Sequence, residues 1–457
     1  ALVASGLGES VRDYVEPLLD GMFSHGLSDC LADALAEMAV SIPSLLSTIQ
    51  ERILDRVAIL LAGTPFRFFA SKTRSSGGMD GRYSQSRDSV AAVGIFDGES
   101  SNDYGAIALA LNILRTFDLR GHSVMEFVRR CVVRFLDHDS PVVRREAALT
   151  CCRRLSTPPQ RESDGSRRQA PVGAYTSGVV GEVLSHLLRV AISDQDPEIR
   201  YAVLVNLDSR FDNHLAVADN LRSLFIVLND EKFQTREVAI SLIGRLITRN
   251  PAYVLPGLRK TLLQLLTELE FSNDVLSKEE SARMLGHLIR AAPRLIKPYV
   301  PTIFKVLISR LSDHSVTVAA CVLGTLGELC TVGGRDMLEY VHELLPRVID
   351  TLQDQSSASK RVAALSTLGK LLQNTGYVNK PLYEYPPLLP NLLACMRSDE
   401  ASDARREAER VIGVVGALDP FEHRIIQSDV ANEKSGRSGD LLPSLGMGSS
   451  LDDYYPR

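Results

Sequence analysis

The sequence has no long apolar run and no large excess of one charge. Its apolar stretches are short, such as Val57–Ala62, whereas a membrane-spanning helix needs about 20 apolar residues in a row. The 51 lysines and arginines and 56 aspartates and glutamates leave a formal net charge of −5, too small to attract a phosphate backbone uniformly. These absences predict a chain that neither inserts directly into a membrane nor binds nucleic acid.

Cysteine is scarce and scattered. The seven cysteines, mostly flanked by apolar helix-forming residues, are Cys30, Cys131, Cys151, Cys152, Cys321, Cys330 and Cys395. This odd number and wide spacing suit buried free thiols in a reducing compartment. No secretory signal is visible. We therefore expect a cytoplasmic protein.

The sequence also lacks the short motifs that assemble an active site. It contains no G-x-x-x-x-G-K-[ST] loop for phosphate, no G-x-S-x-G nucleophile elbow and no H-R-D or D-F-G of a protein kinase. It contains neither H-E-x-x-H nor C-x-x-C for a metal. His138 and His314 each follow an aspartate, but solvated turn residues explain them better than a proton relay. We expect no catalytic residue, no cofactor and no metal site in this chain.

Two recurring patterns indicate a repeat. The first is a Leu or Ile, then Gly, any residue, and Leu or Val, with glycines 42, 41, 42 and 44 residues apart: Gly244, Gly286, Gly327, Gly369 and Gly413. The second is an apolar residue followed by proline, at Pro256, Pro301, Pro346 and Pro390. Proline is favoured in the first turn of a helix, so each proline is predicted to begin a helix and each glycine to lie deep in a second one.

The period and the apolar spacing define the fold class. A chain of 457 residues is too long for one compact core, and its apolar residues show helical spacing without strand alternation. A period of 41 to 45 residues with two helices is typical of HEAT or armadillo arrays. We predict an all-α fold, an α-solenoid of about seven to nine HEAT-type helical hairpins. A mid-helix glycine costs about 1 kcal/mol relative to alanine, so each repeat glycine is expected to allow close approach of a neighbouring helix.

Charged residues recur at the turns between paired helices. An acidic residue precedes an arginine by six positions in three pairs: Asp194 and Arg200, Asp230 and Arg236, and Asp399 and Arg405. Elsewhere the match is imperfect, since Lys278 and Arg361 lack an acid at that spacing and Asp313 precedes Ala319. We interpret the pairs as a charge ladder that ties adjacent turns, worth about 0.2–1 kcal/mol for each exposed pair. The alternative is a set of isolated caps and solvated arginines.

The repeat is interrupted by polar segments. HEAT-like hairpins are predicted at 1–70 and 104–155, and a HEAT array at 179–426. Segments 71–103 and 156–178 are rich in Ser, Gly, Pro and Arg, so they are predicted to be flexible insertions, with serines beside arginines as candidate phosphorylation sites. Segment 427–457 is predicted to be a linker or tail. Because both ends fall in ordinary sequence, we expect a piece of a longer protein.

Several blocks resemble the HEAT region of target-of-rapamycin (TOR) kinases. They agree with that family in order and spacing, and the likeness runs roughly from Leu18 to Tyr455, weakest in the two insertions. The blocks are Asp196–Tyr201 with Asp208–Asp212, Glu280–Leu288 with Ala292–Ile296, Thr375–Val378, and Arg405–Ala408 with Gly416–Pro420.

The resemblance implies a large serine/threonine protein kinase that senses nutrients as a dimeric complex, with its catalytic domain outside this segment. In that family the helical repeats hold the dimer together and bind a substrate-recruiting adaptor, raptor. The resemblance therefore implies a raptor-like adaptor and a second copy of the kinase as partners. It also implies a cytoplasmic location, with peripheral attachment to the lysosomal or vacuolar membrane through the parent complex. No family catalytic residue matches a position in this chain.

The residues alone leave a second function open. A free-standing HEAT solenoid, such as a transport receptor or a phosphatase scaffold, shares the same period. An enzymatic role hidden in the insertions is disfavoured, because they lack clustered acids, bases or nucleophiles. In either binding role, a stacked array presents a long face on which large partners bind across several repeats.

Overall fold

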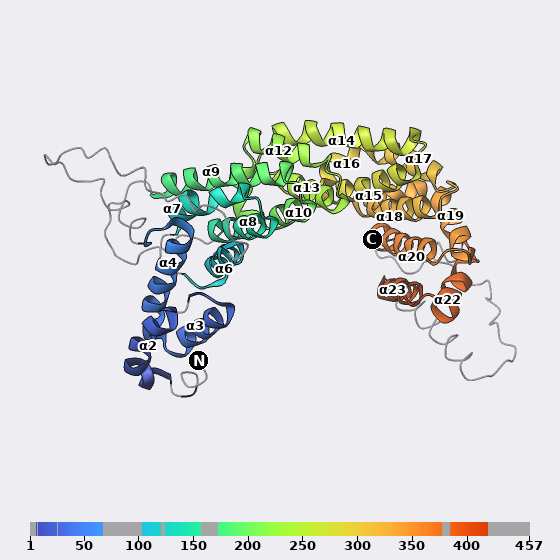
Figure 1. The fold of residues 1–457 in the computed structure, drawn as a ribbon. Coiled ribbons are helices and arrows are strands. Elements are labelled where there is room, and N and C mark those ends of the chain that lie inside the picture. The colour runs from blue at the N-terminus through green and yellow to red at the C-terminus, as the bar shows by residue number, and fades with distance from the viewer. Residues whose placement is uncertain are drawn as a thin grey trace, which may run out of the picture. The chain divides into compact units, whose positions relative to one another are not determined.

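The computed structural model describes residues 6, 8–24, 26–66, 103–119, 124–156, 172–376 and 384–418. Within these ranges helices are the only regular secondary structure (Figure 1). The chain divides into two compact units, residues 1–263 and 264–457, which we describe separately. The predicted tail 427–457 lies outside the described residues, as do nearly all of the predicted insertion 71–103 and most of the insertion 156–178.

Unit 1 is a stack of helical hairpins. Its longer helices are α2 (Arg12–Ser24), α3 (Asp29–Ser41), α4 (Leu46–Ala62), α6 (Asp103–Thr116), α8 (Pro141–Leu155), α9 (Val172–Ser193), α10 (Pro197–Val205), α12 (Ala218–Val227), α13 (Phe233–Leu246) and the start of α14 (Pro251–Phe271). Short helical turns connect them: η1 (Gly8–Val11), η2 (Pro43–Leu45), α7 (Met125–Phe127), η4 (Val128–Val132), η5 (Val133–Asp137), η6 (Ser209–Phe211) and α11 (Asp212–Leu215).

The layers of unit 1 follow chain order. We use "second helices" for the C-terminal helix of each hairpin. The second helix α8 packs on α6, α10 packs on α8, and α13 packs on α10, while α9 and α12 each cover the second helix that follows them. Apolar side chains between the two helices of each layer are fully buried, for example Leu187 of α9 and Ile240 of α13. This burial is the main stabilising contribution to each layer.

Unit 2 has the more regular stack. Its helices are α15 (Val275–Ala291), α16 (Pro293–Ile296), η7 (Lys297–Tyr299), α17 (Val300–Arg310), α18 (Val316–Gly333), η8 (Gly334–Tyr340), α19 (Val341–Gln353), α20 (Ala358–Thr375), α22 (Leu388–Ser398) and α23 (Ser402–Leu418). The second helices α15, α18, α20 and α23 pack on one another in that order, with α17, α19 and α22 as their partners. The prediction of an all-α solenoid built from helical hairpins is confirmed.

Polar caps begin the second helices of unit 2. The side chains of Asp274, Ser315 and Ser357 accept hydrogen bonds from the backbone N–H groups of Ser277, Val318 and Lys360. Each cap pairs a backbone donor that has no partner inside its own helix. The hydroxyl or carboxylate at this position therefore fixes where the helix starts.

Two of the repeat prolines do not begin a helix. Pro301 lies at the start of α17 and Pro390 lies in the first turn of α22, as predicted. Pro256 and Pro346, by contrast, lie inside α14 and α19. The start signal of α14 comes earlier, because Pro251 is its first residue and the Asn250 side chain accepts from Tyr253 N at 3.2 Å. A proline in the next turn loses one backbone hydrogen bond without ending the helix.

Helix α9 corrects a predicted boundary. It begins at Val172, inside the segment 156–178 that we predicted to be an insertion. The sequence from Val172 onward contains apolar residues at helical spacing, whereas the Pro and Arg content that marked the insertion ends before it. The helix therefore extends further toward the N-terminus than composition indicated.

One described segment, Val316–Gln353, is long and apolar enough to cross a membrane by composition, and 56% of its most apolar window is buried inside the fold. It contains α18, whose buried side chains include Val322, Leu326 and Leu329. Helix α18 packs between α15 and α20. A core helix enclosed on both sides accounts for this apolar composition.

Candidate protein-interaction surface

Three of the repeat glycines lie where second helices touch. A methyl group added at Gly286 would meet Thr325 Oγ1 at 3.3 Å, and one added at Gly327 would meet the Thr367 Cα at 3.3 Å. At Gly369 it would meet the Arg410 guanidinium at 2.8 Å. The α15–α18, α18–α20 and α20–α23 packings thus each place a glycine against the next helix. Close approach of the helices offsets the propensity cost of these glycines.

The other two repeat glycines behave differently. Gly413 is exposed on α23, and nothing lies within 4 Å of a methyl group built on it. The expected close approach is therefore wrong for Gly413, because α23 is the last described second helix and no described helix covers that side. Gly244 is buried in α13.

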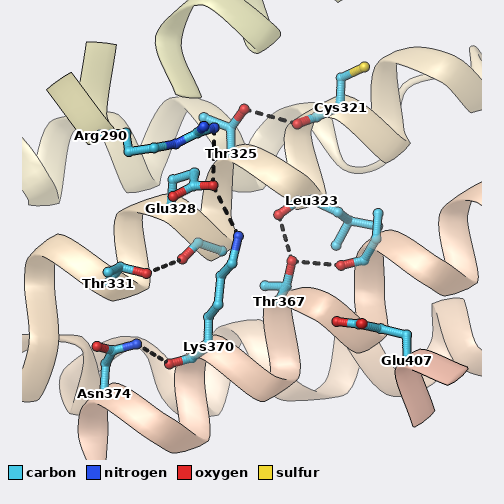
Figure 2. Close-up of polar contacts among 12 residues, drawn as sticks. Arg290, Cys321, Leu323, Thr325, Glu328, Thr331, Thr367, Lys370, Asn374 and Glu407 are labelled. Carbon is cyan, nitrogen blue, oxygen red and sulfur yellow. Dashed lines mark hydrogen bonds and ion pairs between the residues drawn. The ribbon is translucent and has the colours of Figure 1, made fainter. Parts of the chain in front are cut away.

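A threonine two residues before the glycine ties the same helices together, which we did not predict. The Thr325 hydroxyl lies 2.7 Å from Ala282 O of α15 and 2.9 Å from Cys321 O of its own helix. Thr367 repeats this arrangement with Leu323 O of α18 at 2.7 Å (Figure 2). The single hydroxyl hydrogen can be donated to either carbonyl. The sequence signal was present as Thr-Leu-Gly in both repeats.

The Glu328 carboxylate of α18 connects three second helices of unit 2. Lys370 of α20 donates to Glu328 Oε1 at 3.0 Å, and Arg290 of α15 lies 3.3 Å from the same oxygen (Figure 2). Glu328 and Lys370 occupy the variable position directly after the repeat glycines Gly327 and Gly369. Both side chains are partly buried, at 18% exposure for Glu328 and 29% for Lys370, whereas Arg290 is 60% exposed.

The acidic turn residues share one geometry. In each, Oδ1 accepts a hydrogen bond from the backbone N–H two residues later, at 2.8 to 3.0 Å. This bond closes an Asx turn and fixes the chain between the two helices of a layer. The residues are Asp194, Asp230, Asp313, Asp354 and Asp399.

Four of these aspartates, all except Asp354, pair with a cation from the preceding layer. Arg200 Nε donates to Asp230 Oδ2 at 2.7 Å, and Arg361 Nε donates to Asp399 Oδ2 at 2.6 Å. These side chains are buried, at 8% and 6% exposure for the first pair and 5% and 3% for the second. The same contact joins Arg144 to Asp194 and Lys278 to Asp313.

The spacing of six residues between an acid and an arginine reflects a contact with the backbone and not with the carboxylate. Arg200 donates to the backbone carbonyl of its own turn residue Asp194 at 2.7 Å, and Arg405 donates likewise to Asp399 O. The carboxylate partner comes from the next layer, so Lys278 needs no acid before it. Our picture of exposed pairs is wrong for these buried contacts. Arg236 lies over the Phe233 ring at 5.4 Å.

The buried pairs shift the pKa values of their members. The hydrogen bond from Arg361 is the main cause that lowers the pKa of Asp399. For Asp313 the hydrogen bond from Ser315 N is the main cause, assisted by Lys278. The carboxylates in turn raise the pKa of Arg144, Arg200 and Arg361. These shifts favour the charged forms of Asp313, Asp399, Arg144, Arg200 and Arg361 near neutral pH.

Unit 1 joins its layers through arginines that bind carbonyls at helix ends. Arg154 donates to Leu114 O at 2.5 Å and to Phe117 O at 2.6 Å, where α6 ends. Burial lowers the pKa of Arg154 to about 10, which still leaves it charged near neutral pH. Arg210 donates to Ser156 O, and Arg245 donates to Leu207 O at 3.0 Å. Cations at helix C-termini satisfy carbonyls that lack helical partners.

A cleft of about 580 Å³ opens on the second-helix side of unit 1, between α10 and α13. Aliphatic side chains, including Leu204, Val205 and Leu242, line its interior, and Tyr201 and Ser241 contribute polar groups. Sequence reasoning missed this cleft, because it arises where α10 stops after nine residues while α13 has 14.

No group of three or more His, Cys, Asp or Glu side chains among the described residues is arranged to hold a metal ion. Burial raises the pKa of Cys152 and Cys330 to about 12, so these thiols stay protonated and are poor nucleophiles. The described second helices carry fixed charges, and α10 and α13 border a cleft.

Comparison with known families matches two parts of the chain. Residues 275–329, which include α15 to α17 and most of α18, match a HEAT-like repeat. Residues 378–457 match the serine/threonine-protein kinase mTOR domain.

Relatives that match nearly the whole of this chain are TOR kinases. The chain is 39% identical over 97% of its length to the serine/threonine-protein kinase TOR of Arabidopsis thaliana. It is 39% identical over 99% of its length to TOR2 of Saccharomyces cerevisiae. The chain belongs to the TOR family. It spans only 18% of the length of either relative, so it corresponds to one segment of a TOR kinase.

Solved structures agree on the fold. The karyopherin Kap121p in a form bound to Ste12p aligns with a TM-score of 0.55 over 89% of this chain and 42% of that one. Kap121p bound to Nup53p aligns with a TM-score of 0.53. Sequence identity is 12 to 13%, so these structures show a shared helical-repeat fold.

Proposed function

We propose that this chain is the helical-repeat scaffold of a TOR-type serine/threonine protein kinase, whose catalytic domain lies outside it. The observation that carries the proposal is 39% identity over nearly the whole chain to a segment of TOR kinases. The described helices support it, because their second-helix sides carry fixed charges that large partners can contact across several repeats.

The proposed partners are a raptor-like adaptor subunit and a second copy of the parent kinase. Regularly spaced groups such as Glu328 and Lys370 are held by neighbouring layers, so they are preorganised for binding. The parent complex would act in nutrient and growth signalling in the cytoplasm, with peripheral attachment to lysosomal or vacuolar membrane.

Purification of the full-length protein from its own cells tests this proposal. We expect co-purification of one adaptor in equal amount, a mass corresponding to two copies of the kinase, and transfer of phosphate to protein substrates. The isolated 457-residue chain should transfer none. A full-length protein without kinase activity would refute the assignment.

The second candidate is a free-standing transport receptor, which the shared fold with Kap121p favours. A transport receptor would purify without kinase activity. A complex that transfers phosphate but carries no adaptor or second kinase would keep the scaffold assignment and remove the proposed partners.

A further inference from the structure

The cleft between α10 and α13 has the size of a ligand site. Its volume of about 580 Å³ falls within the range of about 300–1,000 Å³ for natural binding pockets. Val205 at its edge is 50% exposed although it is aliphatic. An exposed aliphatic group beside an apolar hollow gains free energy when another apolar group covers it.

Ion pairs fix the shape of the cleft. Arg245 donates to Asp212 Oδ1 at 2.8 Å and to Leu207 O at 3.0 Å, which holds the chain where α10 ends. Asp208 accepts from Arg210 N at 2.9 Å and caps the next helical turn. The site is therefore preformed, so little ordering would be needed on binding.

The rim offers both donors and acceptors. Tyr201, Ser209, Gln234 and Ser241 contribute hydroxyl and amide groups around an aliphatic interior. Tyr201, Ser209 and Gln234 carry groups that can donate or accept a hydrogen bond, whereas the Ser241 hydroxyl donates to Glu237 O at 3.0 Å and can accept one. A polypeptide backbone has alternating N–H and C=O groups, so it can be satisfied by such a rim.

At one end of the cleft, the charged groups that face solvent are carboxylates. Lys232, whose ammonium lies 4.8 Å from the centre of the Tyr201 ring, pairs with Glu198, and Arg200 pairs with Glu231. The cations are the enclosed partners, at 18% and 8% exposure, whereas Glu198 is 68% and Glu231 is 74% exposed. At this end an incoming ligand therefore meets carboxylates, and the charged residues that line the cleft itself are two acids and one cation, Asp208, Glu237 and Arg245. This charge disfavours a phosphate ligand and favours a basic one.

We propose that this cleft binds a short segment of a partner protein in which one aliphatic side chain is flanked by lysine or arginine. The aliphatic side chain enters the hollow beside Val205, and the basic residue lies against Glu198 and Glu231. The proposal rests on the scaffold function above and gives it a partner chemistry.

Selection of displayed random 12-residue peptides on the 457-residue chain tests the proposal. We expect the enriched peptides to share an aliphatic residue next to Lys or Arg. Val205→Glu should weaken binding of an enriched, fluorescein-labelled peptide by about tenfold, as loss of a buried anchor does. Ile226→Glu on α12 is the matched control, because Ile226 is also 50% exposed but does not line the cleft.

The charge is tested separately. The double variant Glu198→Gln and Glu231→Gln should weaken the same peptide roughly threefold at low salt and reduce the salt dependence of its affinity. Equal binding to Val205→Glu and wild type, or enrichment of acidic peptides, would overturn the proposal. Circular dichroism of each variant shows whether it is folded; if Val205→Glu is not, Val205→Ser provides the same comparison.

The outcomes separate the two proposals. If the peptide result is negative while the full-length protein still co-purifies with its adaptor and has kinase activity, only the cleft proposal fails. If the full-length protein lacks kinase activity while Val205→Glu still weakens peptide binding, the cleft proposal stands and the family function fails.

Discussion

Units 1 and 2 join similar helical hairpins by partly different means. In unit 2, repeat glycines let the second helices approach closely, as at Gly327. The threonine bridge occurs in both units, at Thr367 and at Thr150 of α8, whose hydroxyl lies 2.9 Å from Leu111 O of α6. In unit 1, arginines such as Arg245 bind the carbonyls at the ends of neighbouring helices. Close helix contact leaves no room for a ligand, whereas joining at helix ends tolerates a short helix and the cleft beside it. The buried Asp–Arg pairs also occur in both units, so they are a common element of the two stacks.

The largest expected effect tests that common element. Arg361→Ala should lower the free energy of unfolding by about 3–5 kcal/mol, because Asp399 would be left buried without its partner. Arg200→Ala in unit 1 should cost a similar amount. Urea unfolding followed by circular dichroism measures both. Lys360→Ala is the control, since its 3.9 Å pair with Asp354 is partly exposed and should be worth less than about 1 kcal/mol.

The next effect tests close approach in unit 2. Gly327→Val should destabilise the chain by about 1–3 kcal/mol, because its side chain meets the Thr367 backbone. Gly413→Ala should instead stabilise α23 by up to about 1 kcal/mol, since that position is open and alanine is the better helix former. Thermal unfolding distinguishes the two. Equal losses at both positions would contradict the role given to Gly327.

A smaller effect concerns the threonine bridge. Thr367→Val keeps the shape but removes the hydroxyl near Leu323 O, so we expect a loss of about 1 kcal/mol. Thr331→Val is the control, because Thr331 is exposed and contacts only Gly327 O of its own helix, at 3.2 Å. Hydrogen exchange of α18 and α20 should rise in the first variant only. A rise confined to the control would refute the bridge.

The smallest effect is a pH dependence. The pKa of Asp399 is lower in the folded chain than its ordinary value of 3.8. Its contribution to stability is therefore complete above pH 3.8 and lost as the pH falls through the folded-state pKa. In the Asp399→Asn variant the side chain can still accept the hydrogen bond of the turn, but it carries no charge. The free energy of unfolding of this variant should therefore change less between pH 5 and pH 2 than that of the wild type. Acid unfolding followed by circular dichroism measures this change. If the pair contributes nothing, the curves of Asp399→Asn and the wild type will coincide.

The glycine, proline and charge patterns differ in how much of the structure they predicted. The glycine period predicted the second helices of unit 2, because only a repeated helix–helix contact offsets a repeated glycine. The proline marker was less reliable, since Pro256 lies within a helix that Pro251 had already begun. The partner of Arg200 could not be predicted from spacing within one repeat, because Asp230 belongs to the next layer.

The sequence by itself determined the all-α repeat, its period and the family, because these depend on local apolar spacing and on residues that recur along the chain. Only the tertiary structure decided that the turn charges are buried between layers and that Glu328 is shared by Arg290 and Lys370. It also decided that a cleft opens beside α10. These features depend on distances between residues about 30 to 45 positions apart, which packing fixes and composition does not.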